Sequence, residues 1–406
     1  KIADHYKSKG AYVLLGGLHV TSLPEEAAPH ADSIFIGPGE ETFPQFLRDF
    51  KNKVPKKVYR SGIRTLDKIP PVRRDLIKRN RYLVPNSIVV SRGCPHHCIF
   101  CFKDAFFEGG KSFYTQAVDD ALTEIDRLPG RHLYFLDDHL LGNAKFAAAL
   151  FEGMKGMNRV FQSAATIDSI LRGNLVEKAA EAGLRSLFVG FETFSSGNLR
   201  QSNKKQNLQK DYKKAVKRLH DLGIMINGSF VFGLDEDDKD VFKRTVEWGI
   251  ENSLTTSTYH ILTPYPGTQL YADMLKQERI LTSNWDLYDT RHVVYKTKHL
   301  SSDELEEGYR WAYREFYTWS NIIRSSVKHD SIKHIMKHFL YSGGWKKFEP
   351  LWNFIIKTRN LNNMLPILES ILSKVEDNKT KLPYENTPPL IEELKPLTTT
   401  NINLNI

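Results

Sequence analysis

Cysteine is almost absent from this sequence. The chain has 406 residues but only three cysteines, and all three lie between positions 94 and 101. An odd number of cysteines in one short segment cannot form a framework of disulfide bonds, so the sequence indicates a reducing, cytoplasmic setting. Random placement would give this arrangement on the order of once in tens of thousands of chains, which indicates a shared chemical task for the three thiols.

Long apolar runs are also missing. No segment approaches the roughly 18 consecutive apolar residues of a membrane-spanning helix, and the first residues do not form a signal peptide. The chain begins with Lys1 rather than methionine, so we expect a fragment whose natural start lies upstream. Apolar residues make up 41% of the chain and charged residues 26%. This composition excludes global disorder, and the length predicts two or three domains.

Acidic residues are fewer than basic ones, 48 against 57, which gives a net charge of +9. Such an excess suits an anionic partner such as a nucleic acid. The basic residues are scattered, however, and gather only at positions 73–81, 204–218 and 328–347. Charge alone therefore disfavours nucleic-acid binding, which is kept as an alternative.

Residues 1–50 alternate between strand and helix patterns. Strands are expected at Tyr12–Leu15 and Ser33–Ile36, and each leads into a glycine turn. Helices are expected to follow them at Ser22–Ala28 and Thr42–Phe50. This order predicts parallel strands with their glycine turns at one edge of a sheet. The polar, proline-containing residues 51–85 predict a linker.

The same alternation recurs six times within residues 86–298. The expected strands are Ser87–Ser91, His132–Leu136, Val160–Ala164, Leu187–Phe191, Ile226–Phe232 and Ser257–Leu262. The expected helices include Gln116–Leu128, Ala144–Met154, Ile170–Ala182, Leu208–Leu222 and Asp238–Asn252. Six strand–helix units predict an open (β/α)6 partial barrel in an α/β protein, with its chemistry on the loops after the strand ends.

Residues 299–375 predict a C-terminal helical region. Its first helix, Leu300–Ser325, carries an aromatic stripe that is typical of core packing. Two further helices are expected at Ser331–Phe339 and Pro350–Lys374. Residues 376–406 are rich in lysine, proline, threonine and asparagine, and they predict a disordered tail.

The cysteines follow the spacing C-x3-C-x2-C, at Cys94, Cys98 and Cys101. Zinc needs four ligands, so a zinc site here would need a histidine in addition. Candidates for that histidine are His96, His97 and His139. Iron–sulfur clusters usually take four thiolates, and three thiolates on a four-iron cluster would leave one iron open to a substrate or cofactor. This chemistry favours the cluster over zinc.

The cysteine motif, placed after the first strand of a six-unit barrel, resembles that of the radical S-adenosylmethionine (SAM) enzymes over about residues 86–295. The resemblance implies that the three cysteines hold a 4Fe-4S cluster and that the amino and carboxylate groups of SAM chelate the fourth iron. One-electron reduction would then cleave SAM to the 5′-deoxyadenosyl radical. An electron donor such as flavodoxin or ferredoxin and a small-molecule substrate are implied as well.

The resemblance also assigns positions that bind SAM. Phe100 matches an aromatic residue placed against the adenine, and Gly233 lies in a stretch that flanks it. Asp137 or Asp138 stands where the family binds the methionine amino group, and a carboxylate can accept from an ammonium. Glu192 matches a polar position near the nucleoside and the methionine.

The N-terminal segment resembles the second half of a cobalamin-binding domain, which often precedes radical SAM barrels. The resemblance rests on the stretches 15–21 and 31–40, whose turns contain Gly16, Gly17, Gly37 and Gly39. It implies that these glycines let the corrin ring and the nucleotide tail lie against backbone. We therefore expect a truncated Rossmann-like cobalamin-binding half-domain, with cobalamin as a third cofactor.

Three functions remain open from the sequence. The first is a cobalamin-dependent radical SAM enzyme that transfers a methyl group or modifies a small-molecule metabolite in another way. The second is a radical SAM enzyme without cobalamin, and the third is a basic zinc- or nucleic-acid-binding α/β protein. A tRNA methylthiotransferase is disfavoured because those enzymes carry a second set of cysteines. Candidates for proton handling are His96, His97, His139, His260 and His292.

Overall fold

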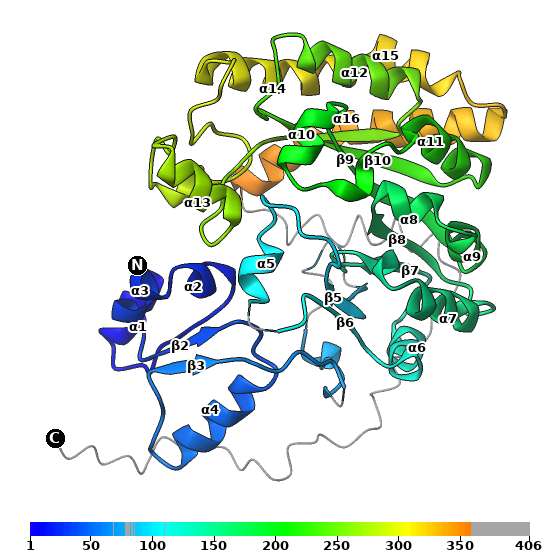
Figure 1. Cartoon of the computed structure of the whole chain (residues 1–406). Helices are drawn as coiled ribbons and strands as arrows, with labels where there is room; N and C mark the ends of the chain where they lie inside the picture. Colours follow the sequence, from blue (N-terminus) through cyan, green and yellow to red (C-terminus); the bar gives the residue numbers. More distant parts are fainter. Residues whose placement is uncertain (68, 78–81, 83, 85, 109, 359–406) are drawn as a thin grey trace.

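The computed structural model describes residues 1–358 except 68, 78–81, 83, 85 and 109 (Figure 1). The expected tail at 376–406 and the last part of the helix expected at Pro350–Lys374 lie outside these residues. Within the described part, no helix is both long and apolar enough to cross a membrane. The chain forms a small N-terminal sheet, a larger six-stranded sheet and a C-terminal group of helices.

The N-terminal sheet has three strands in the order β1-β2-β3, and all pair in parallel. Strands β1 (Leu14–Leu15) and β2 (Ser33–Ile36) are neighbours, as the sequence predicts. Strand β3 (Val58–Arg60) is an addition, because it falls within the segment expected to be a linker. The helices of this part are α1 (Ile2–Lys7), α2 (Leu18–Ser22), α3 (Pro24–Ala27) and α4 (Thr42–Lys51).

The larger sheet has the order β11-β10-β9-β8-β7-β4, and every neighbouring pair is parallel. Its strands are β4 (Ser87–Ile88), β7 (His132–Phe135), β8 (Val160–Ala165), β9 (Leu184–Glu192), β10 (Met225–Phe232) and β11 (Thr256–Ile261). The strand order follows the sequence without closing on itself, which confirms the open six-stranded partial barrel. An antiparallel pair, β5 (Ser91–Gly93) with β6 (Phe113–Thr115), stands beside it.

Helices connect the strands of the larger sheet and cover its outer face (Figure 1). They are α6 (Val118–Arg127), α7 (Ala144–Met154), α8 (Ile167–Leu171), α9 (Leu175–Glu181), α10 (Ser196–Gln201), α11 (Tyr212–Asp221) and α12 (Val241–Glu251). Helix α13 (Gln269–Lys276) follows the last strand and lies apart from this outer face (Figure 1). The apolar faces of the covering helices pack on the strands and bury large side chains of both, such as Phe151 of α7 and Phe135 and Phe230 of the sheet. Burial of this kind supplies the main driving force for the fold.

The aromatic C-terminal helix is two helices, α14 (Ser302–Phe316) and α15 (Trp319–Ser326), rather than one. Thr318 separates them because its hydroxyl accepts a hydrogen bond from an amide in the first turn of α15. The tyrosines of this stretch do more than fill a core. The Tyr313 and Tyr317 hydroxyls each bond a backbone amide and a carbonyl of β11. These hydroxyls thereby pair with backbone N–H and C=O groups of β11, which lies at the edge of the sheet.

A single helix, α16 (Ile332–Thr358), covers the region where two helices with a break were expected. The residues between the two expected helices, 340–349, include Gly343 and Gly344, and glycine weakens a helix. The structure uses Gly343 for close packing instead, because an added Cβ would lie 3.1 Å from the ring of Trp319. The glycine therefore marks a helix–helix contact and not a helix end.

The N-terminal sheet domain contacts the barrel beside the cysteine segment. Helix α2 packs against the short helix α5 (Lys103–Phe106), which lies between the two sheets (Figure 1). The indole of Trp285 donates a hydrogen bond to Glu26 of α3, at 3.0 Å. A Cβ on Gly267 would lie 2.9 Å from the hydroxyl of Ser22. These contacts place the N-terminal domain at the barrel end that carries the strand-end loops.

Candidate functional site

The three cysteines lie on one loop between β5 and α5. The amide of Cys94 donates to the Ser112 carbonyl at 3.0 Å, and the Cys101 amide donates to the Cys98 carbonyl at 3.0 Å. The side chain of Lys103, 1% exposed, reaches back to the Cys94 carbonyl at 3.0 Å. Backbone and a buried lysine therefore fix the shape of the loop.

Gly93 makes the entry into this loop possible. Its φ is +77°, and a Cβ there would lie 1.9 Å from the Ser112 carbonyl oxygen. We expect Gly93→Ala to displace Ser112, which precedes β6, and to abolish metal loading of the loop, measured as iron per chain after anaerobic reconstitution. Gly156→Ala is the matched control, since its φ is +84° but its Cβ would meet nothing within 4 Å. Equal iron in the two variants would contradict this reading of Gly93.

Cys98 is buried and Cys94 and Cys101 are half-buried, and positive charge lies close to the thiols. Burial raises the pKa of Cys94 to about 11 and that of Cys101 to about 12, while the nearby Lys103 ammonium lowers both. Lys204, 5% exposed, also lies close enough to Cys98 and Cys101 to interact with their charge. Two buried ammonium groups thus offset the charge of bound thiolates.

The loop fits a multi-iron cluster better than a single zinc ion. No three histidine, cysteine or carboxylate side chains within the described residues are grouped closely enough to hold one metal ion. The histidines considered as a fourth zinc ligand face other partners. His97 contacts Asp104 at 3.1 Å, and His139 contacts Thr166 at 3.2 Å. With these histidines engaged elsewhere, three thiols on one loop suit a cluster in which each thiolate binds its own iron.

The two aspartates after β7 have different surroundings. Asp137 is 3% exposed and accepts hydrogen bonds from the amide and hydroxyl of Ser91, each at 2.5 Å, and from the Val90 amide. Burial raises its pKa to about 7 against these bonds. Asp138 is exposed, and it accepts from the amide of Gly93 at 2.8 Å. Asp138 is thus the carboxylate that is open beside the cysteine loop, whereas Asp137 holds the backbone after β4.

Glu192 ends β9 in a left-handed conformation, with φ of +65°. Its carboxylate forms a buried ion pair with Lys204. Burial lowers the pKa of Lys204, but the Glu192 charge and the nearby thiols raise it overall, so the ammonium form is kept. Backbone strain at a strand end is characteristic of functional sites. The sequence indicated Glu192 but gave no signal for Lys204, which looked like one charge in a basic run.

Gly233 follows the last residue of β10, whereas Phe100 lies on the cysteine loop. Phe100 is partly buried against the apolar cluster that includes Leu234 and Tyr295. Gly233 has a φ of +91°, and its carbonyl accepts from the Tyr295 hydroxyl at 2.5 Å. A Cβ on Gly233 would lie 2.4 Å from that hydroxyl, so packing alone requires glycine here.

The four N-terminal glycines end two neighbouring strands but are not equivalent. Gly16 packs against Phe35, and Gly37 lies beside Arg64. A Cβ on Gly17 or Gly39 would meet nothing within 4 Å. The next residue, Glu40, forms an ion pair with Arg92 at 2.6 Å, two positions before Cys94. The open glycine edge and the cysteine loop are therefore held side by side.

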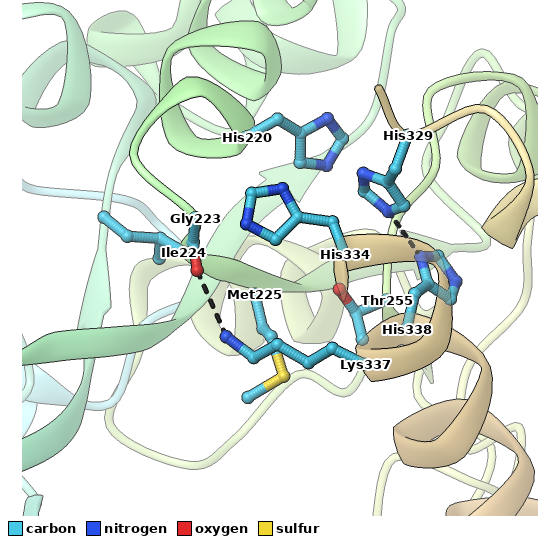
Figure 2. A pocket seen from close by; sticks show the side chains of 9 residues that line it. All are labelled: His220, Gly223, Ile224, Met225, Thr255, His329, His334, Lys337 and His338. Atoms are coloured by element: carbon cyan, nitrogen blue, oxygen red, sulfur yellow. Dashed lines mark hydrogen bonds between the residues drawn. The ribbon is translucent and has the colours of Figure 1, made fainter. Parts of the chain in front are cut away.

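A pocket lies at the end of the barrel strands opposite the cysteine loop, where β10 begins with Met225 (Figure 2). Four histidines from α11, α16 and the residues before α16 line it, and His329 contacts His338 at 2.8 Å. It is separate from the cysteine loop. Of the five histidines considered for proton handling, His97 and His139 are described above, and His96, His260 and His292 face Asp168, Thr290 and Asp289.

The model of the radical SAM superfamily matches residues 88–249. The chain is 30% identical over 338 residues, 80% of its own length and 73% of the other's, to a bacteriochlorophyllide d C-12(1)-methyltransferase of Chlorobaculum tepidum. It is 28% identical, over 83% of this chain and 77% of the relative, to an uncharacterized methyltransferase of Pyrococcus horikoshii. The chain belongs to the radical SAM superfamily.

Solved structures share the fold. The cobalamin-dependent radical enzyme OxsB, with aqua-cobalamin and SAM bound, superposes with a TM-score of 0.60 at 17% identity, covering 92% of this chain and 64% of that one. TsrM of Kitasatospora setae, with cobalamin and a [4Fe-4S] cluster, gives a TM-score of 0.56 at 14% identity, covering 68% and 62%. The chain thus spans less than two thirds of either solved protein. Radical SAM enzymes use a 4Fe-4S cluster and SAM, which fits the three thiols of the loop.

Proposed function

We propose that this protein is a cobalamin-dependent radical SAM methyltransferase that methylates a carbon atom of a small-molecule metabolite. The observation that carries the proposal is the juxtaposition of two sites: the ion pair between Glu40 and Arg92 holds the open glycine edge against the cysteine loop. A methyl group that passes between two cofactors requires both to face one space. When bound, the cluster with SAM supplies a one-electron route to a carbon radical, and cobalamin supplies the methyl group.

The chain's own residues would position these groups. Cys94, Cys98 and Cys101 would hold three irons, and Asp138 would accept from the SAM ammonium. Glu192 with Lys204 would present a paired acceptor and donor at the next strand ends. Phe100 would lie against the adenine. Gly17 and Gly39 would leave backbone open to the corrin ring.

The relatives inform the substrate. Two of them are named as bacteriochlorophyllide d methyltransferases, at 30% and 28% identity. Bacteriochlorophyllide d is therefore the first substrate to test. The reaction also needs a low-potential one-electron donor of the flavodoxin or ferredoxin kind, in a reducing compartment such as the cytoplasm.

The test is an anaerobic reaction of the reconstituted protein with cobalamin, a reductant, the substrate and SAM that carries a deuterated methyl group. We expect deuterated methyl in the product together with 5′-deoxyadenosine, and neither with the Cys101→Ala variant. 5′-Deoxyadenosine without any methylated product or S-adenosylhomocysteine would exclude methyl transfer and leave a radical SAM enzyme of another kind.

Removing the charge of Asp138 should weaken SAM binding. Asp138→Asn keeps an oxygen that accepts from Gly93 but loses the charge-assisted bond to the ammonium. We expect SAM affinity to fall by about 1.5–3 kcal/mol, or roughly ten- to a hundredfold. Isothermal titration with the cluster-loaded protein measures this, and Asp120→Asn, at an exposed position of α6, is the control. Unchanged affinity would show that SAM lies elsewhere along the strand ends.

A further inference from the structure

The segment after α10, residues 202–206, clamps the cysteine loop at three points. The Ile99 amide donates to the Ser202 carbonyl at 3.1 Å. The Asn203 side chain donates to the His97 carbonyl at 2.5 Å. The Gln206 amide donates to the sulfur of Cys98 at 3.4 Å. We call residues 202–206 the clamp segment.

The clamp segment is itself fixed to the barrel. Asn207, 1% exposed, follows Gln206 directly and donates to the carbonyls of Gly190 and Phe191 at 2.9 and 3.1 Å. The Lys204 amide donates to the Leu199 carbonyl at 2.8 Å. Gln206 is therefore held between β9 and the loop, so its contact with the sulfur is not that of a free surface side chain.

The three sulfurs differ in the N–H groups near them. The backbone amide of His96 acts to lower the pKa of Cys94, and that of Lys103 acts to lower the pKa of Cys101, against the effect of burial. Within the described residues, Cys98 is the one cysteine whose sulfur accepts from a side chain. A substitution can remove a side-chain donor without moving the backbone. The hydrogen bond from Gln206 to Cys98 can therefore be removed by mutation, whereas a backbone amide cannot.

We propose that Gln206 tunes the reduction potential of the cluster and is a positioning residue for the radical reaction. One electron from a low-potential donor converts the oxidised cluster to the reduced one, with no bond formed or broken in the protein. The added electron increases the negative charge on the sulfurs. An N–H donor therefore stabilises the reduced state more than the oxidised state, which raises the potential. This inference rests on the cluster of the proposed function and not on cobalamin or methyl transfer.

The test is a redox titration of the reconstituted full chain, followed by the electron paramagnetic resonance signal of the reduced cluster. Gln206→Leu removes the donor, and Gln206→Glu keeps the size while adding negative charge. We expect reduction to be about tenfold less favourable in Gln206→Leu, which is about 59 mV for a one-electron couple. The potential of Gln206→Glu should be lower still. Gln201→Leu, the same change at an exposed glutamine five positions away, should match the wild type.

Iron analysis separates the possible failures. Both Gln206 variants with full iron and wild-type potentials would overturn the proposal. Loss of iron in both variants would also overturn it, because Gln206 would then serve cluster assembly and not potential. A wild-type protein without iron or a reduced-cluster signal would instead refute the cluster itself, and with it the proposed function.

Discussion

Replacing any one of Cys94, Cys98 and Cys101 with alanine should reduce bound iron from about four atoms per chain to near zero and abolish reductive cleavage of SAM. The fold should survive, because the loop lies beyond the strand ends and none of the three thiols is in the barrel core. Iron and sulfide analysis, visible absorption and 5′-deoxyadenosine formation measure the loss. Circular dichroism and gel filtration check the fold.

His97→Ala is the matched control for these variants. His97 lies in the same loop, its side chain is 61% exposed, and it contacts Asp104 rather than a thiol. We expect the variant to keep its iron and its SAM cleavage. A cysteine variant that retained full iron, or a His97 variant that lost it, would refute the assignment of the three thiols as the whole set of protein ligands.

Most of the large sheet could be predicted because four of its strands, β8 to β11, are six to nine residues long and contain many apolar residues. Strand β8, for example, was expected at Val160–Ala164 and is found at Val160–Ala165. Strand β3 was missed because only its middle residue is buried. Tyr59, 2% exposed, stacks on Phe35 with 5.2 Å between ring centroids, and both flanking residues of β3 are exposed. Three residues within a basic, proline-containing segment give no recognisable period, so only the tertiary contact defines the strand.

The candidate site also contains both residues that the sequence identified and residues that only the structure reveals. The spacing of the cysteines identified their loop, because that chemistry is local in sequence. Lys204 and Gln206 could not be found this way, since they approach Cys98 from about a hundred residues further along the chain. The pair Asp137 and Asp138 shows a third case. The sequence identified both aspartates as candidates. Only the structure shows that the Asp137 carboxylate already accepts hydrogen bonds from the amides of Val90 and Ser91.

A bulky residue on the open glycine edge should remove cobalamin from the full-length protein. Gly39→Trp is the cleanest variant, because its Cβ meets nothing within 4 Å and its backbone is not left-handed. Gly17→Trp should act in the same way with added backbone strain, since its φ is +96°. The indole would fill the space where a flat ring needs bare backbone. We expect loss of the corrin absorption after gel filtration, with the iron–sulfur band unchanged.

Gly10→Trp is the matched control for this experiment. Gly10 has a φ of +81°, and its Cβ also meets nothing within 4 Å, but it precedes β1 whereas Gly17 follows it. The two substitutions therefore impose similar strain at opposite ends of one strand. Gly10→Trp should keep the corrin spectrum. If wild-type protein reconstituted with cobalamin under anaerobic conditions shows no corrin band, the N-terminal domain serves packing alone, and a radical SAM enzyme without cobalamin replaces the methyltransferase proposal.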